Sequence, residues 1–311
     1  MSFSYREEQR AGQTLDVLTE EGTGVRIIVS RLGAELVSLA RRRSPNEWIG
    51  YLHRDDDLTP ATGTWSNHAT VMGYFLHRLK NGRSLYRGQE IVGGNHGFLR
   101  TKTWHGPGAD LENGCLAYEI TSEDFGPTEY PLNVSLVFSY QLEGERLRVT
   151  FRFHNHEPEL AAHVGFGLHP GFAATENAPL LLNLPAGSYR RYFSPNNFLS
   201  GETQLFHHAG GQMPFAREKL PCSFILEFVD VPERTLRFAD PPSGRTIELD
   251  FNAVPYVTLW SDGGPFLCVE PCWGLTDHDE QRAFEDKEGI QTIAAGGELQ
   301  KSFTLLPRIN F

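Results

Sequence analysis

Hydrophobic and polar side chains alternate with a period of two over much of the chain. Residues 132–142 carry an apolar or aromatic side chain at every even position, and residues 147–153 alternate in the same way after Glu143-Gly144-Glu145. Successive side chains of a strand point to opposite faces of a sheet, so each run has one face suited to burial. The two runs predict an antiparallel hairpin with one buried face.

Further pairs of short apolar runs flank turn residues and predict more hairpins. They are residues 25–30 and 36–41 around 31–34, residues 75–80 and 83–88 around Asn81-Gly82, and residues 236–238 and 246–251 around 241–244. Asn-Gly is a favoured two-residue hairpin turn. The chain ends with another strand-like run at 302–306, and residues 277–286 alone favour a short helix. The pattern predicts one all-β domain over residues 1–311, an antiparallel β-sandwich with few short helices.

Composition narrows the range of partners. The chain has 28 Lys and Arg against 39 Asp and Glu, a formal net charge of −11, and no basic block, which argues against nucleic acid. No window approaches the roughly 20 apolar residues that span a bilayer, and the first residues lack an apolar signal-peptide stretch. We therefore expect a soluble cytoplasmic protein without a membrane partner. The sequence leaves monomer and homodimer as open alternatives.

The cysteines do not predict a metal site. Cys268 and Cys272 are four residues apart, but no second close pair completes a zinc site with them. Together with Cys115 and Cys222 they are interpreted as reduced thiols. No glycine-rich nucleotide-binding motif precedes a helix, so no organic cofactor is expected either.

Three titratable residues occupy distinctive local settings. His96 lies in a glycine-rich stretch, His169 precedes Pro170, and Glu270 follows the apolar run 266–269. A residue before proline is held extended, and an unpaired carboxylate at the end of an apolar strand is unfavourable without a partner or a role. Two imidazoles and a carboxylate are sufficient to transfer protons near neutral pH. Their wide separation means that only the whole fold can assemble them.

His154-Asn155-His156 offers an alternative metal site, because its two imidazoles share one face of a strand. Glu157, Glu159 and His163 follow, which superficially resembles the ligand set of the cupins. The glutamates fall too close to His156 for that ligand spacing. Metal-dependent catalysis is therefore disfavoured.

An ordered set of short motifs runs from residue 33 to residue 298. They are residues 33–39 (GAELVSL), 77–82 (HRLKNG), 96–100 (HGFLR), 169–172 (HPGF), 269–271 (VEP) and 287–298. In this order the motifs resemble those of the aldose 1-epimerases, or galactose-mutarotase-like proteins, over nearly the whole chain. Residues 270–274 (EPCWG) are most similar to the LacX-like bacterial branch of that family.

The resemblance implies a β-supersandwich fold that interconverts the α and β anomers of a free aldose without a metal or an organic cofactor. Carried over by position, Glu270 is expected to be the general base that takes the proton of the anomeric hydroxyl. His169 is expected to be the general acid at the ring oxygen, and His96 to polarise that oxygen. Arg78 is expected to bind sugar hydroxyls.

The resemblance leaves the substrate open. Arg100 follows the HGF element where the hexose-6-phosphate mutarotases carry an arginine, so a phosphosugar is an alternative. The substrate-binding aspartate of the family has no unambiguous counterpart in this chain, and Asp250 and Asp262 are the candidates for it. A carbohydrate-binding protein of the same fold without activity is an alternative of another class. Three aromatic residues are further candidates for the sugar pocket: Phe172, Trp260 and Trp273.

Overall fold

The computed structural model describes residues 1–63, 65–216, 220 and 223–309, which form strands joined by turns. The helical segments among these residues are single 3₁₀ turns, namely η1 (Lys80–Gly82), η2 (Leu99–Thr101), η4 (Pro241–Ser243) and η5 (Phe284–Asp286). None of the described residues belongs to a helix long and apolar enough to cross a membrane. The all-β fold class predicted from the sequence is confirmed.

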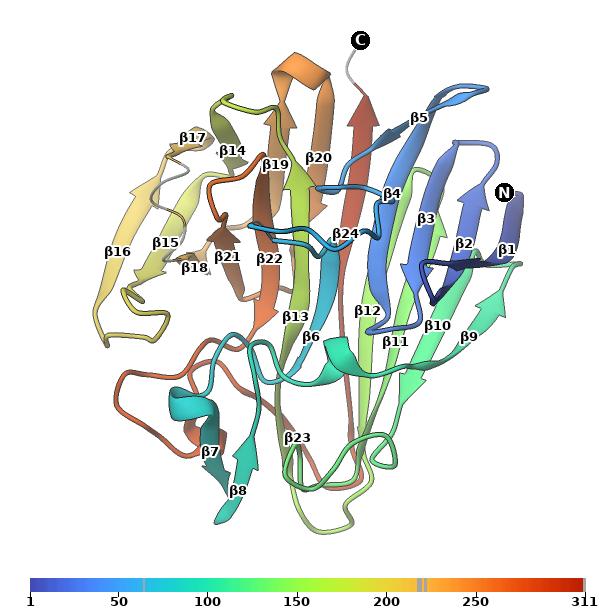
Figure 1. Cartoon of the computed structure of the whole chain (residues 1–311). Coiled ribbons are helices and arrows are strands. Elements are labelled where there is room, and N and C mark those ends of the chain that lie inside the picture. The colour runs from blue at the N-terminus through green and yellow to red at the C-terminus, as the bar shows by residue number, and fades with distance from the viewer. Residues whose placement is uncertain (64, 217–219, 221–222, 310–311) are drawn as a thin grey trace.

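Antiparallel sheets make up the molecule (Figure 1). A five-stranded sheet follows the chain order: β1 (Phe3–Arg10), β2 (Gln13–Glu20), β3 (Val25–Ser30), β4 (Glu35–Ser44) and β5 (Glu47–Gly50). A nine-stranded sheet has the order β17 (Gly211–Phe215), β14 (Leu180–Leu184), β19 (Thr235–Asp240), β20 (Arg245–Asp250), β24 (Glu298–Ile309), β12 (Arg146–Asn155), β11 (Val134–Glu143), β10 (Cys115–Ile120) and β9 (His105–Asp110).

The eight-stranded sheet is the one that carries the site. Its order is β16 (Thr203–His208), β15 (Gly187–Tyr192), β18 (Phe224–Asp230), β21 (Tyr256–Trp260), β22 (Phe266–Trp273), β13 (Ala162–Ala173) and β23 (Gln291–Ile293), and β6 (Ala69–Tyr74) also pairs with β13. A separate small hairpin consists of β7 (Arg83–Tyr86) and β8 (Gln89–Val92). Figure 1 shows β6, β13 and β22 side by side near the middle of the molecule.

Three predicted hairpins are confirmed. β11 and β12 pair from Val134 opposite Asn155 to Glu143 opposite Arg146, and their alternating apolar side chains are buried. The runs at 25–30 and 36–41 lie within β3 and β4, and those at 236–238 and 246–251 lie mainly within β19 and β20.

The hairpin predicted around Asn81-Gly82 is wrong. Both residues have the positive φ of such a turn, but they form η1, and the strand that follows pairs with β8 instead. Residues 75–80 lie beside another segment, because Asp277 N donates to Arg78 O at 3.1 Å and Lys80 N donates to Asp277 Oδ2 at 2.6 Å. Local turn preference is thus overridden by contacts with a distant segment.

The helix predicted over 277–286 is also largely wrong, since only η5 at its end is helical. The Asp277 carboxylate accepts hydrogen bonds from Lys80 N and from the ammonium group of Lys287, and both groups of that ion pair are buried. These long-range partners hold the segment as an irregular loop.

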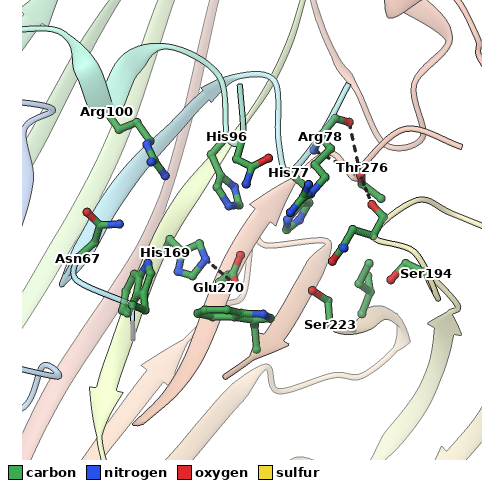
Figure 2. Close-up of a pocket in the computed structure, with 15 residues that line it drawn as sticks. Asn67, His77, Arg78, His96, Arg100, His169, Ser194, Ser223, Glu270 and Thr276 are labelled. Carbon is green, nitrogen blue, oxygen red and sulfur yellow. Dashed lines mark hydrogen bonds and ion pairs between the residues drawn. The ribbon is translucent and has the colours of Figure 1, made fainter. Parts of the chain in front are cut away.

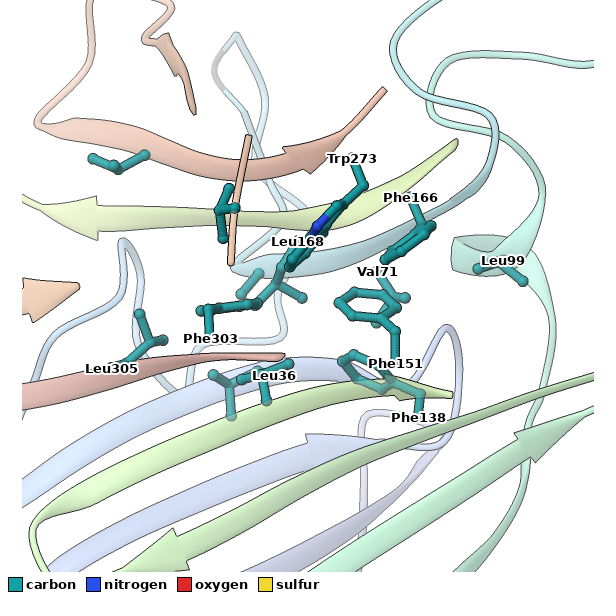
Figure 3. Packing of buried hydrophobic residues seen from close by; sticks show 14 of the residues in the cluster. Leu36, Val71, Leu99, Phe138, Phe151, Phe166, Leu168, Trp273, Phe303 and Leu305 are labelled. Atoms are coloured by element: carbon teal, nitrogen blue, oxygen red, sulfur yellow. The ribbon is translucent and has the colours of Figure 1, made fainter. Parts of the chain in front are cut away.

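A layer of aromatic side chains fills the space between the nine-stranded and eight-stranded sheets (Figure 3). Phe138 and Phe151 of the first sheet are 4.7 Å apart between ring centroids, and Phe151 lies 5.0 Å from Phe166 of the second. Phe166 in turn stacks on Trp273, its cross-strand partner, at 5.0 Å. One face of β13 and β22 is therefore committed to the core, and alternation turns the residues between to the opposite face.

Candidate active site

His169 and Glu270 face each other across two neighbouring central strands. Gly167 pairs with Cys272 and Gly171 with Cys268, and this register places His169 of β13 opposite Glu270 of β22. The His169 Nε2 atom lies 3.3 Å from Glu270 Oε1. Both residues are almost fully buried, because only 5% of the surface of His169 and 1% of the surface of Glu270 is exposed. The sheet therefore joins the imidazole and the carboxyl group that the sequence leaves 101 positions apart.

His96 reaches the same place from the loop between β8 and η2 (Figure 2). Its ring is perpendicular to the His169 ring, with 5.0 Å between centroids. Gly73 N donates to His96 O, and Phe98 N donates to Gly73 O, both at 3.1 Å, so the loop is bound to the end of β6. Gly97 has φ +72°, and a β-carbon there would overlap the carbonyl oxygen of Gly73. Only glycine fits this close approach.

These residues border a cavity of about 260 Å³, just below the roughly 300–1,000 Å³ typical of ligand pockets. Six of the ten site residues predicted from the sequence line it, namely His96, His169, Glu270, Arg78, Arg100 and Trp260. The remaining lining residues are Trp65, Asn67, His77, Asn95, Ser194, Asn197, Ser223, Ile225 and Thr276. His77 belongs to the HRLKNG motif, so the sequence contains a feature that could have identified it as a site residue. The others come from irregular loops that carry no periodic pattern, or from positions without distinctive chemistry.

Two indole rings flank His169. The Trp65 ring lies 5.0 Å and the Trp260 ring 5.8 Å from the imidazole, and the two indoles are 6.0 Å apart between centroids. Trp260 shares the cavity-facing side of the sheet because it pairs with Cys268, two residues from Glu270. The indoles surround the acid–base pair with apolar surface and offer flat faces to a ligand.

Burial controls the protonation of the pair. It raises the pKa of Glu270 well above its ordinary value. Burial, together with His77 and Arg100, lowers the pKa of His169 to about 3. Burial also lowers the pKa of His96 well below its ordinary value, with a further contribution from His169. Desolvation therefore favours the uncharged carboxylic acid and the uncharged imidazoles, because it outweighs the attraction across 3.3 Å.

Several polar atoms of the site have no hydrogen-bond partner. Among the described residues, the buried atoms His96 Nδ1, His169 Nδ1 and Glu270 Oε2 are all unsatisfied. Buried polar atoms are normally paired, and unpaired ones cluster where a ligand or water completes them. The cavity is therefore equipped to bind a ligand with several hydroxyl groups.

Four predicted site residues do not line the cavity. Phe172 and Trp273 are buried on the opposite face of the sheet from His169 and Glu270, because each is three residues away along its strand. Asp250 ends β20 in the other large sheet. Asp262 lies closer, and its Oδ2 accepts the backbone N–H of Trp65 at 2.7 Å, so it holds the Trp65 loop and does not border the cavity.

Potential metal ligands surround Glu270 in two groups. The ligand atoms of His77, Glu270 and Cys272 lie within 4.8 Å of one another, as do those of His169, Cys268 and Glu270. Both cysteines are fully buried free thiols, and burial raises their pKa well above the ordinary value, which disfavours the thiolate that binds metals. Cys115 is also a free thiol, and Cys222 lies outside the described residues.

Comparison with known proteins places the chain in a family. A galactose mutarotase-related enzyme from Lactobacillus acidophilus superposes with a TM-score of 0.81 at 20% identity, covering 94% of this chain and 99% of the other. A galactose mutarotase-like protein from Lactobacillus casei superposes with a TM-score of 0.82 at 21% identity, covering 94% and 100%. A galactose mutarotase-like protein from Clostridium acetobutylicum gives 0.74 at 14% identity, covering 99% of each.

These likenesses establish the shared fold. No curated protein sequence matches the chain. The family model of aldose 1-epimerase, in contrast, matches residues 16–277, which include every motif from GAELVSL to VEP. The chain therefore belongs to the aldose 1-epimerase family.

Proposed function

We propose that the protein interconverts the α and β anomers of an aldose sugar by opening and closing the sugar ring. The observation that carries this proposal is the contact between His169 Nε2 and Glu270 Oε1 at 3.3 Å, buried at the cavity. An acid and a base held side by side can serve the two oxygens of a hemiacetal at once.

The pair works with a single proton. In its ionised arrangement, the Glu270 carboxylate takes the proton of the anomeric hydroxyl while the His169 imidazolium gives its proton to the ring oxygen. The bond from the anomeric carbon to the ring oxygen breaks, leaving an aldehyde, a carboxylic acid and a neutral imidazole. Rotation about the neighbouring C1–C2 bond turns the other face of the aldehyde to the ring hydroxyl. The reverse transfers then close the ring and restore the ionised pair, so no proton is gained or lost.

The surrounding residues are suited to hold the sugar. His96, beside His169, is placed to hydrogen-bond the ring oxygen. Arg78 and Arg100, with the amides and hydroxyls of the lining, offer partners for the remaining hydroxyls. The protein binds such a small-molecule sugar between the indoles and these polar groups.

An anionic sugar such as a hexose phosphate is a second candidate substrate. Among the described lining residues, Glu270 is the single carboxyl group, whereas Arg78 and Arg100 supply two guanidinium groups. Arginine pairs well with phosphate and carboxylate groups. The two guanidinium groups favour an anionic sugar, and the rates measured on neutral and phosphorylated sugars distinguish the two candidates.

The test is the rate of anomer exchange, followed by NMR on freshly dissolved sugars, neutral and phosphorylated. We expect acceleration by the wild type, and loss of most of it in Glu270→Gln and in His169→Asn with the fold intact. Full activity in Glu270→Gln would overturn the assignment of the base. Saturable binding of sugars without acceleration of any would identify a binding protein instead.

A further inference from the structure

His77 is a third imidazole in the cavity, and the ring-opening steps above do not use it. It follows β6 with a φ of +54°, a backbone conformation that residues other than glycine seldom adopt. Its carbonyl oxygen accepts the backbone N–H of His96 at 2.7 Å, and the two rings lie 5.3 Å apart. Backbone conformations of this kind cluster at functional sites, so the conformation of His77 points to a role in the site.

The His77 side chain points at the catalytic carboxyl group. One of its ring nitrogens lies within 4.8 Å of both a Glu270 carboxyl oxygen and Cys272 Sγ. Its Nε2 atom is 3.4 Å from the hydroxyl of Thr258, which is the cross-strand partner of Glu270 on β21. Figure 2 shows His169 on one side of Glu270 and His77 on the other. Glu270 is therefore flanked by two imidazoles.

The two imidazoles engage the carboxyl group unequally. His169 lies against Oε1 at 3.3 Å, whereas Oε2 is buried and has no hydrogen-bond partner among the described residues. A carboxylate that acts as a base needs a fixed orientation and donors that favour its ionised form. A ring nitrogen of His77 lies within 4.8 Å of a Glu270 carboxyl oxygen, so a movement of either side chain that brings the two atoms into hydrogen-bond distance would supply such a donor.

We propose that His77 is a positioning residue for Glu270, donating a ring N–H hydrogen bond to the carboxylate whenever Glu270 is ionised. His77 exchanges no proton with the sugar. The donor is the neutral ring, because burial and the nearby cations Lys287 and Arg78 lower the pKa of His77 to about 4. The other groups that face it are His96, Cys272 and Thr258. This proposal rests on the proposed function, and its test includes a readout that does not need activity.

Two substitutions separate hydrogen bonding from packing. His77→Leu keeps comparable bulk but has no donor, whereas His77→Gln retains an amide N–H. In His77→Leu we expect kcat to fall about ten-fold or more, the scale of one hydrogen bond to a charged group, with KM changed less than about two-fold. The acidic limb of the kcat profile should move to higher pH, because the ionised form of Glu270 loses a donor. His77→Gln should retain most of kcat.

The matched control is His207, an exposed histidine on β16 that does not line the cavity, changed to Leu and to Gln. Wild-type kcat and pH profile in His77→Leu would overturn the proposal. Equal losses in His77→Leu and His77→Gln with an unshifted profile would also overturn it, since that result indicates packing alone.

Infrared titration gives the independent readout. The protonated carboxyl band of Glu270, assigned by its loss in Glu270→Gln, should persist to higher pH in His77→Leu than in the wild type. An unchanged titration would overturn the role of His77. If the wild type accelerates no sugar, the proposed function fails, while this titration still decides the relation between His77 and Glu270.

Discussion

Gly171 lies directly beneath the indole of Trp65, so close that a β-carbon at residue 171 would overlap the ring. Gly171 is on the cavity-facing side of β13, two residues from His169. The absence of a side chain at residue 171 lets the Trp65 ring lie 5.0 Å from the His169 imidazole, and Asp262 Oδ2 accepts the backbone N–H of Trp65. A strand position thus determines how an irregular loop completes the site.

Gly171→Ala should therefore displace Trp65 and weaken sugar binding. We expect KM to rise several-fold, about 1 kcal/mol of binding free energy, with a smaller effect on the free energy of unfolding because Trp65 is only half-buried. Steady-state anomer-exchange kinetics and urea denaturation measure the two effects. Gly126→Ala is the control, since a β-carbon there meets nothing closer than 3.9 Å. Unchanged kinetics in Gly171→Ala would show that Trp65 does not contact the sugar.

The two tryptophans of β21 and β22 should respond differently to the same substitution. Trp273→Ala empties a core position stacked on Phe166 and should reduce the free energy of unfolding by about 3–5 kcal/mol. Trp260→Ala removes a half-buried indole that borders the cavity and should instead raise KM about ten-fold, or roughly 1.4 kcal/mol. Denaturation and kinetics on both variants check the contrast. A larger loss of stability in Trp260→Ala than in Trp273→Ala would contradict it.

That contrast also shows how much of the site is readable from the sequence. The alternation that predicts strands implies that Trp273 and Glu270, three residues apart, lie on opposite faces, and the same holds for Phe172 and His169. Applied to these strands, it would have excluded both aromatics from the site. The hairpin of β11 and β12 is equally predictable from the sequence, because the alternating pattern and the turn residues indicate the same local structure.

Other features depend on contacts that local pattern does not encode. The register that sets His169 opposite Glu270 joins strands far apart in the chain, and periodicity does not encode it. The family resemblance assigned both residues to one site but not to neighbouring strands. Trp65 lies in a loop without regular structure, and its position depends on Gly171 and Asp262. Asn81-Gly82 has the backbone of a hairpin turn, yet Asp277 determines the path of the chain there.

The buried ion pair of Lys287 and Asp277 holds in place the segment that adjoins Arg78 and Thr276, two residues that line the cavity. Lys287→Met should reduce the free energy of unfolding by about 3–5 kcal/mol, because it leaves the Asp277 carboxylate buried without its cation. Asp277→Asn combined with Lys287→Met removes both charges and should recover part of the loss. Urea denaturation of the single and double variants provides the measurement. A double variant less stable than Lys287→Met would show that the carboxylate acts chiefly through Lys80 N.

His53 predicts a pH dependence of stability in the acid range. Its ring packs on Phe266 at 4.6 Å, and its Nε2 is buried without a hydrogen-bond partner among the described residues. Burial, with Arg54, lowers its pKa to about 4. An unfolded histidine titrates near 6.5, so between about pH 6.5 and pH 4 the unfolded chain binds the proton and the folded one does not. His53 therefore makes folding less favourable as pH falls through this window, by at most about 1.4 kcal/mol per pH unit.

His53→Phe removes this titration while keeping an aromatic ring against Phe266. The free energy of unfolding, measured by urea denaturation from pH 7 to pH 4, should fall less steeply in His53→Phe than in the wild type. The remaining slope includes His77 and His169, whose lowered pKa values act in the same direction. Because only the difference between the two slopes is attributed to His53, the exposed His207→Phe is the control and should reproduce the wild-type slope. Equal slopes in His53→Phe and the wild type would mean that the folded protein protonates His53 as readily as the unfolded chain does, and that the buried ring finds a partner for its charge.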